Sequence, residues 1–307
     1  MGYIIIDLEF NNLKNITKYY ADFFEKYEDL KNLEIKNEII EIGAVKVDKY
    51  MKPVSMIREY IIPTIFPIIN PIVNEITKID MELLEKRGID FKEAINKLKE
   101  MFEEGDVLCS WAKDDIVELI INAHYHNYTD LNWLDSYLDI QEYATKILAH
   151  KKAMGLKAAL DELKIKVDNT KLHDALNDAE YTVDVFKRIY NSRIVKNYIV
   201  KDIYNMPAIN VSNLQSIKID EEKLELKCPK CGKKITLETP IKLLNWRFAA
   251  LGSCSKCKNN ILCEIQVKNT FQGDIVYNEV NTILKGESYL NYSYKFENLI
   301  IEEEKLQ

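Results

Sequence analysis

The N-terminal stretch has the clearest pattern of apolar and polar positions in this chain. Residues 3–10 read Tyr-Ile-Ile-Ile-Asp-Leu-Glu-Phe, an apolar run that ends in two carboxylates placed two residues apart. Strand side chains alternate between faces, so Asp7 and Glu9 are expected on one face and Ile4 and Ile6 on the other. A run this apolar is typical of a central strand that is covered on both sides.

Two acids on one face of such a strand repel each other unless a cation lies between them, and this favours a divalent metal site. The simpler interpretation is that Asp7 and Glu9 mark the point where a buried strand enters a polar loop. For an isolated Asp-x-Glu pair the simpler interpretation is preferred. The choice therefore depends on whether acids later in the chain converge on the same place.

Apolar periodicity predicts an α/β fold for the first two thirds of the chain. Further strands are predicted at residues 38–48, 58–62, 106–111 and 135–141. Helices are predicted at residues 11–36 (as an insertion), 81–86, 91–102, 116–125, 156–163 and 174–190. In the last helix, Asp178 lies at the edge of the apolar stripe, which would turn an acid toward the sheet.

The order of these elements divides the chain into two domains joined by a linker. An early run of strands followed by alternating helices and strands indicates an α/β domain over residues 1–200. Residues 201–222 are expected to be a linker. Short strands and turns around the cysteines predict a small β-rich domain over residues 223–307.

Composition restricts the function classes only weakly. The net charge of -7 gives no general nucleic-acid signature, so any such binding must come from a local patch. Residues 223–268 hold ten Lys or Arg against three Glu, interleaved with Trp246 and Phe248, which makes them a candidate nucleic-acid surface. The alternative is a solvated domain that packs on the catalytic domain or on a protein partner. A cytoplasmic protein without a membrane segment is expected, because no signal-peptide pattern or long apolar run is present.

Four of the six cysteines have the spacing of a structural zinc site. Cys228-x-x-Cys231 and Cys254-x-x-Cys257 are separated by 22 residues. Two such pairs can each close a tight turn and together hold one tetrahedral Zn²⁺, as in a zinc ribbon. A disulfide or redox role is a weaker alternative. Cys263 could be a spare ligand, although its apolar surroundings favour a buried core residue.

A second acidic stretch supports the metal interpretation of the first. His173 precedes Asp178 by five residues, and Asp114 and Asp115 follow the predicted strand at 106–111. Together with Asp7-x-Glu9, these motifs resemble, in order and context, the DEDDh 3′-5′ exonucleases, which include RNase T-like and DNA polymerase III proofreading-like enzymes. The sequences NEIIEIGAVKVD at 37–48 and HDALNDAEYT at 173–182 are also similar to that family. The histidine subclass is favoured over the tyrosine subclass, because residue 174, four positions before Asp178, is aspartate and not tyrosine.

The resemblance covers residues 3–190 and implies an RNase H-like fold, a mixed five-stranded sheet flanked by helices. It implies two Mg²⁺ or Mn²⁺ ions about 4 Å apart. Asp7, Glu9 and Asp178 would hold the first ion, and Asp7 with Asp115 the second. His173 would take a proton from the attacking water. Asp115 is preferred over Asp114 as the second-motif acid, but either residue could serve.

The implied activity is removal of nucleoside 5′-monophosphates from the 3′ end of single-stranded nucleic acid, with RNA favoured over DNA. A DNA-directed trimming or proofreading exonuclease is the alternative within the same class. A binding scaffold that kept the fold without turnover is the alternative from another class. A homodimer, or a protein partner that binds through the zinc ribbon, is a further option that the sequence leaves open.

Overall fold

The computed structural model describes residues 2–33, 35–168, 172–206, 209–211, 214–245 and 247–306. The chain divides into two compact units, Met1–Ile203 and Tyr204–Gln307. Each unit has its own sheet and its own apolar core. The domain boundaries that the sequence suggests at residues 200 and 222 stay predictions. Residues 201–222, expected as a linker, carry the short strand β7 (Ile209–Asn210) and short 3₁₀ turns.

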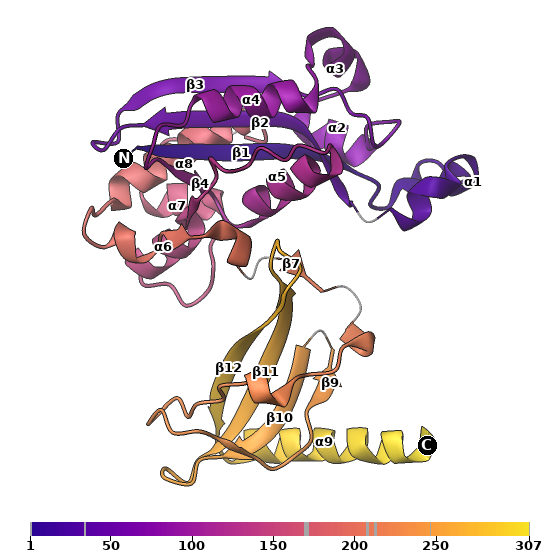
Figure 1. Ribbon diagram of the computed structural model, residues 1–307, viewed down its shortest axis with the longest axis vertical. Helices are drawn as coiled ribbons and strands as arrows, with labels where there is room; N and C mark the ends of the chain where they lie inside the picture. Colours follow the sequence, from indigo (N-terminus) through magenta and orange to yellow (C-terminus); the bar gives the residue numbers. More distant parts are fainter. Residues whose placement is uncertain are drawn as a thin grey trace. The chain divides into compact units, whose positions relative to one another are not determined.

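The first unit is built on a mixed six-stranded sheet in the order β3-β2-β1-β4-β5-β6 (Figure 1). Its strands are β1 (Tyr3–Asn12), β2 (Asn37–Val47), β3 (Pro53–Tyr60), β4 (Val107–Ser110), β5 (Ser136–Asp139) and β6 (Val200–Lys201). The strand β1 is antiparallel to β2 and parallel to β4. The mixed α/β class is confirmed, but the expected five strands are six, because the two-residue strand β6 pairs with β5 at the edge.

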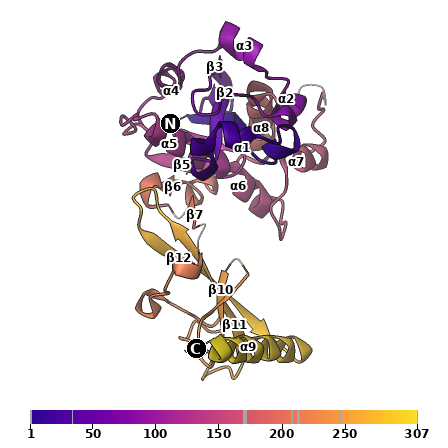
Figure 2. The same ribbon diagram turned by 90° about the vertical axis from the view of Figure 1, so that its right-hand side faces the viewer.

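Helices cover both faces of this sheet. They are α2 (Pro71–Thr77), α3 (Met81–Arg87), α4 (Phe91–Glu100), α5 (Asp114–Tyr125), α6 (Ile140–Ile147), α7 (Leu156–Glu162) and α8 (Ala175–Ile189). Figure 2 shows α4 and α5 on one side of the strands and α7 and α8 on the other. The odd-numbered side chains of β1 face α8, where Tyr3 and Ile5 join the core that contains Val183 and Phe186.

Two helices of the first unit, α2 and α6, were not predicted from the sequence. Asn70 caps α2 by accepting a hydrogen bond from the Ile72 backbone N–H, and Pro71 occupies the first turn, where its missing N–H costs nothing. Asp139 caps α6 directly at the end of β5. Periodicity favoured a chain break at Pro71 instead of α2, and a longer extended piece over residues 135–141 instead of the start of α6. The capping residues were the missed signal.

The helix predicted over residues 11–36 is wrong. The segment contains the short helix α1 (Phe23–Lys26) between two 3₁₀ turns, η1 (Ile16–Lys18) and η2 (Glu28–Asn32). Asn15, just before η1, has a left-handed backbone with φ 58°, which interrupts any continuous helix. The aromatic residues instead pack locally, with Phe23 in contact with Phe24 and Tyr27.

The second unit has a sheet in the order β12-β11-β10-β8, with β7 added beside β11 and β9 beside β10. Its other strands are β8 (Thr236–Leu237), β9 (Lys242–Leu244), β10 (Arg247–Ser253), β11 (Asn260–Asn269) and β12 (Ile275–Leu284). The helix α9 (Glu287–Leu306) follows β12 and was not predicted from the sequence. It packs through Phe296 onto Ala249 and Leu251. In the part of the chain that the structure describes, no helix is long and apolar enough to cross a membrane.

Candidate active site and cysteine cluster

The candidate active site lies where β1 loses one neighbour. The strand β4 pairs with β1 only from Tyr3 to Ile6, whereas β2 follows β1 as far as Asn12. From Asp7 onward, the edge of β1 that faces β4 is therefore open. Polar side chains can reach this edge without breaking a ladder of backbone hydrogen bonds.

Three of the predicted acids meet at this edge. One oxygen each of Asp7, Glu9 and Asp178 lies within 4.8 Å of the other two. Asp7 and Glu9 share a face of β1, as strand alternation predicts. Asp178 comes from the first turn of α8, more than 160 residues further along the chain. This arrangement brings three carboxylates from two elements to one point.

A glycine allows α8 to come this close to the sheet. Gly43 lies opposite Asp7 in the pairing of β1 with β2. A Cβ atom at Gly43 would lie 2.2 Å from the backbone carbon of Ala175 and from the backbone nitrogen of Leu176. Any larger residue would push away the start of α8 and with it Asp178.

The fourth predicted acid, Asp115, approaches from the open side of β1. It lies in the first turn of α5 and is 8% exposed, whereas its neighbour Asp114 is exposed. Its carboxylate accepts a hydrogen bond from the Leu8 backbone N–H, so it occupies the edge that β4 leaves free. Asp115, not Asp114, is thus the acid next to Asp7, although it lies outside the group of three.

An unusual backbone turn places Asp115. Ala112, between β4 and α5, has φ 91°, a conformation rare for residues with a side chain. Its carbonyl accepts hydrogen bonds from the Ser110 hydroxyl and, at 2.6 Å, from the Tyr137 hydroxyl. Held from both sides, the turn directs α5 back toward β1.

His173 also has a left-handed backbone, with φ 65°. Its backbone N–H donates a hydrogen bond of 3.0 Å to Asp178 Oδ2, and its residue is exposed to solvent. The residue therefore lies next to Asp178 and is open to water. That arrangement suits a group that exchanges protons with solvent.

Sequence reasoning missed a buried ion-pair network beside the cluster. Glu41, 1% exposed, lies opposite Glu9 on β2, and its Oε1 is 3.3 Å from Arg58 Nε. The same guanidinium pairs with Asp174, the residue that caps α8. Glu41 Oε2 accepts a hydrogen bond of 3.4 Å from the Ala175 N–H. Arg58 and Glu41 thus hold the start of α8 against the sheet. An acid between Ile40 and Ile42 in an apolar strand was the available signal, but its partner depends on strand register.

Burial and mutual repulsion raise the pKa values of these carboxyl groups in the absence of a cation. Burial, together with the Asp115, Asp178 and Glu9 carboxylates, raises the pKa of Asp7 well above its usual range. Burial, Glu41 and Asp178 raise the pKa of Glu9 to about 8. Burial and Asp114 raise the pKa of Asp115 to about 8. Each shift would be reversed by a positive charge placed among the carboxylates.

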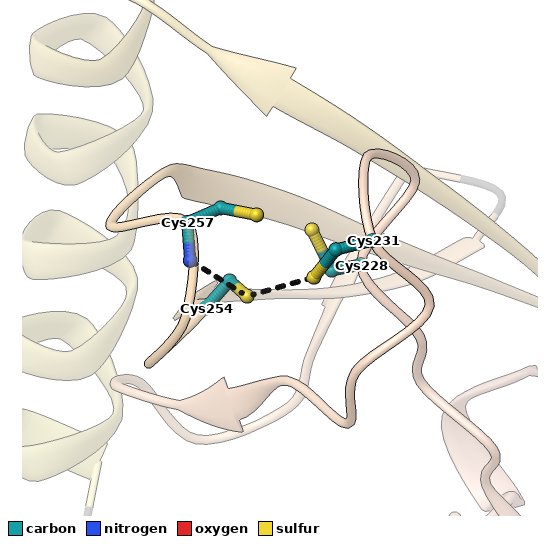
Figure 3. A group of neighbouring side chains, drawn as sticks. All are labelled: Cys228, Cys231, Cys254 and Cys257. Carbon is teal, nitrogen blue, oxygen red and sulfur yellow. Dashed lines mark hydrogen bonds between the residues drawn. The ribbon is translucent and has the colours of Figure 1, made fainter.

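The second unit contains a cluster of four cysteines (Figure 3). The sulfurs of Cys228, Cys231, Cys254 and Cys257 lie within 4.8 Å of one another, as a tetrahedral metal site requires. Cys263 is fully buried in β11 outside this cluster, which agrees with its expected core position. Within the cluster, backbone hydrogen bonds to the Cys254 sulfur, above all from Cys257, lower the pKa of Cys254 to about 7.

The two cysteine pairs lie on turns of the same shape. In the first, the Gly232 N–H donates to the Cys228 carbonyl at 2.8 Å, and in the second the Lys258 N–H donates to the Cys254 carbonyl at 2.8 Å. Gly232 and Lys258 both have left-handed backbones, with φ 71° and 54°. This repeated turn is how each Cys-x-x-Cys directs two thiols to one point.

Comparison with protein families decides the class of the first unit. The family model described as Exonuclease, RNase_T, matches residues 4–186, the segment that contains every acid of the site. The chain belongs to the RNase T exonuclease family. The resemblance to the DEDDh exonucleases is thereby confirmed. No curated protein matches the sequence of this exonuclease-family chain.

Solved structures agree on the fold of this exonuclease-family unit. The nuclease domain of 3′hExo, a DEDDh family member bound to rAMP, has a TM-score of 0.52 and 16% identity over 66% of this chain and 96% of its own. A full-length 3′-exonuclease has a TM-score of 0.50 and 15% identity, and the chain covers only 59% of its length. Exonuclease I has a TM-score of 0.50 and 12% identity over 86% of this chain and 55% of its own.

The acid cluster fits the divalent metal ions that DEDDh exonucleases use. Carboxylate oxygens are the donors that Mg²⁺ and Mn²⁺ prefer. Asp178 Oδ1 is buried and has no hydrogen-bond partner among the described residues, which leaves it free to bind a cation. The donor set and this unpartnered oxygen therefore both suit a metal site.

The basic segment 223–268 differs from its expected form. Phe248 is 7% exposed and belongs to the core of the second unit, so it offers no exposed ring to a base. Arg247 is paired with Glu264. Trp246 lies outside the described residues. Of the two aromatic residues in the predicted nucleic-acid surface, the one that the structure describes is therefore buried.

Proposed function

We propose that this chain is a 3′-5′ exonuclease that hydrolyses phosphodiester bonds at the 3′ end of single-stranded nucleic acid and releases nucleoside 5′-monophosphates. The observation that carries the proposal is the meeting of Asp7, Glu9 and Asp178 within 4.8 Å, beside Asp115. RNA is favoured as the substrate, because the similar nuclease domain of 3′hExo binds rAMP.

In this proposal Asp7, Glu9 and Asp178 hold one divalent ion, Mg²⁺ or Mn²⁺, and Asp7 with Asp115 holds a second. Two such ions would supply the positive charge that stabilises the entering and leaving oxygens of an in-line displacement at phosphorus. Asp115 is positioned for this role by the hydrogen bond that it accepts from the Leu8 N–H. Asp178 is held by the His173 backbone N–H.

His173 is proposed as the general base. Its imidazole would accept the proton of the attacking water and pass it to solvent, to which the residue is exposed. The hydrogen bond from the His173 backbone N–H to Asp178 keeps this residue beside the carboxylates. The four cysteines would hold one structural Zn²⁺.

A ladder assay tests the function. Single-stranded RNA and DNA labelled at the 5′ end are incubated with the full chain and with Asp7→Ala in Mg²⁺, in Mn²⁺ and in chelator. We expect metal-dependent shortening from the 3′ end that is absent in the variant, and faster shortening of RNA. Faster shortening of DNA would favour the trimming or proofreading alternative. Binding without any shortening would favour the scaffold, and unchanged turnover in Asp7→Ala would remove the catalytic assignment.

A further inference from the structure

A pocket of about 520 Å³ lies at the end of β1 that follows the acid cluster. It is formed between the insertion at residues 11–36 and the ends of β1 and β2. Figure 1 shows α1 beyond the end of β1 that lies opposite the N-terminus. The side chains that matter for its chemistry are Asn12, Lys14, Phe24, Lys31, Lys36 and Phe66. Pockets of this size hold small organic ligands.

The charge of this pocket is opposite to that of the acid cluster. Lys14, Lys31 and Lys36 line it, and none of the described lining residues is acidic. Lys36 donates a hydrogen bond to the Leu33 carbonyl and so helps to shape the wall. Lys14 and Lys31 are exposed and make no ion pair with any residue that the structure describes. In a chain of net charge -7, this is a local site for an anion.

One wall of the pocket is apolar and aromatic. Phe66 is buried together with Ile35 and Ile65 and forms the fixed floor of the pocket. Phe24 is half-buried and is held edge-on against Phe23, with ring centroids 5.3 Å apart. A planar ring held beside lysines is the combination by which proteins bind single-stranded nucleic acid, because bases stack on the ring and phosphates meet the cations.

The pocket is within reach of a strand that occupies the acid cluster. Asn12 is three residues beyond Glu9 on β1, which corresponds to about 10 Å at the rise of a β-strand. A single strand stacked at about 3.4 Å per nucleotide covers that distance with about three nucleotides.

We propose that this pocket binds the substrate strand about three nucleotides upstream of the scissile bond. A base would stack on Phe24, and the flanking phosphates would contact Lys14 and Lys31. The insertion at residues 11–36 is thus a substrate-binding element of the exonuclease. This inference rests on the proposed function, since it needs a single strand in the acid cluster.

Binding measured without turnover tests the pocket separately from catalysis. The full chain is titrated, in chelator, against fluorescent oligonucleotides of two, four and twelve nucleotides at several salt concentrations. The pocket variant is K14Q/K31Q, and its matched control is K18Q/K26Q, which removes two lysines of the same segment that do not line the pocket. A third variant, Phe24→Leu, keeps an apolar side chain but removes the ring.

We expect wild-type affinity to rise between two and four nucleotides. K14Q/K31Q should weaken binding of the twelve-mer about tenfold and reduce its salt slope by about two, because each of the two lysines would neutralise one phosphate. Phe24→Leu should cost about tenfold, because the base no longer has a ring on which to stack. The control should stay within about twofold of wild type.

The outcomes separate the pocket from the proposed function. Equal losses in K14Q/K31Q and K18Q/K26Q, with normal metal-dependent cleavage by wild type, would overturn the pocket and leave the function standing. A selective loss in K14Q/K31Q without any cleavage by wild type would support the pocket and overturn the function. A wild-type chain that neither binds nor cleaves single strands would overturn both.

Discussion

The acid cluster and the cysteine cluster reach a similar geometry by different routes. The acids come from β1 and from α8, so they meet only after the sheet and the helix have packed. The cysteines come from two short turns, each of which brings its own pair together. The first cluster is a product of its fold, whereas the second helps to define the fold around it. Removal of metal should therefore affect mainly activity in the first unit and mainly stability in the second.

The largest expected effect is on the cysteine cluster. Cys228→Ser should abolish tight zinc binding and unfold much of the second unit, because a structural Zn²⁺ contributes on the order of 10 kcal/mol of binding free energy. Calorimetry should record loss of the second unit's unfolding transition, with that of the first unit unchanged. Metal analysis should find no zinc bound to the variant.

Cys263→Ala is the matched control for that experiment. Cys263 is as buried as Cys228 but lies outside the cluster, so the variant should keep one zinc per chain and lose only about 1 kcal/mol of stability. A Cys228→Ser chain that still bound one zinc and unfolded like wild type would contradict the assignment of these ligands.

The next largest effect separates two adjacent acids. Asp115→Asn should lower kcat about a hundredfold or more, because it removes a charge beside Asp7 that the proposed second metal ion would need. Asp114→Asn should stay within about twofold of wild type, since that side chain is exposed and outside the cluster. Rates of 3′-end shortening at saturating metal give both values. A larger loss in Asp114→Asn would reverse the assignment.

Asp115→Asn also has an opposite expected effect on stability. In chelator the variant should unfold at the same temperature as wild type or a higher one, because a buried carboxylate that repels Asp7 is gone. An inactive variant that was instead strongly destabilised would indicate a structural role for Asp115.

The sequence could predict the acids but not everything that positions them. Asp7, Glu9 and Asp178 were identified because strand alternation and the edge of a helical stripe place side chains by local rules. Those rules do not reveal which strands are neighbours. The link from Glu41 through Arg58 to Asp174 needs the register of three elements, so it could only be seen in the structure.

The errors in the predicted fold have similar physical causes. The segment 11–36 has helix-like apolar spacing, but Asn15 takes a left-handed conformation and the aromatic side chains pack on one another instead of along one face. Phe248 was interpreted as an exposed ring because basic residues surround it, yet it faces the core of a β-sheet. Both cases depend on tertiary contacts, which override local pattern.

A smaller effect is expected from the network that holds α8. Arg58→Met should lower the free energy of unfolding by about 1–2 kcal/mol, because it leaves Glu41 buried without its cation, while the part-exposed guanidinium limits the loss. We also expect kcat to fall about tenfold, since Asp178 and His173 lie at the start of the released helix.

Lys97→Met is the matched control for Arg58→Met. Lys97 pairs with Glu59 at 3.1 Å and is about as exposed as Arg58, but it has no contact with α8. The loss should be less than about 0.5 kcal/mol, with unchanged kcat. Denaturant unfolding and single-turnover kinetics would compare the two. Equal effects would mean that Arg58 is an ordinary surface ion pair.

The last expected effect is a pH dependence of stability in chelator. In the folded chain Glu9 and Asp115 have pKa values of about 8, whereas unfolded carboxyl groups release their protons near pH 4. Between these values the folded state holds more protons than the unfolded state, so rising pH lowers the free energy of unfolding. We expect the melting temperature of the first unit to fall continuously from pH 5 to pH 8.

Divalent cations and a single substitution should each flatten that slope. Mn²⁺ or Mg²⁺ neutralises the cluster and so should stabilise the first unit more at pH 8 than at pH 5. Glu9→Gln removes one of the groups with a raised pKa, whereas Glu82→Gln, exposed on α3, removes an acid far from the cluster and should leave the slope unchanged. A slope that was the same in wild type, Glu9→Gln and Glu82→Gln and insensitive to metal would place the pH dependence outside the acid cluster. The carboxylates would then be too well solvated to repel one another, and the cysteine cluster alone would couple metal binding to stability.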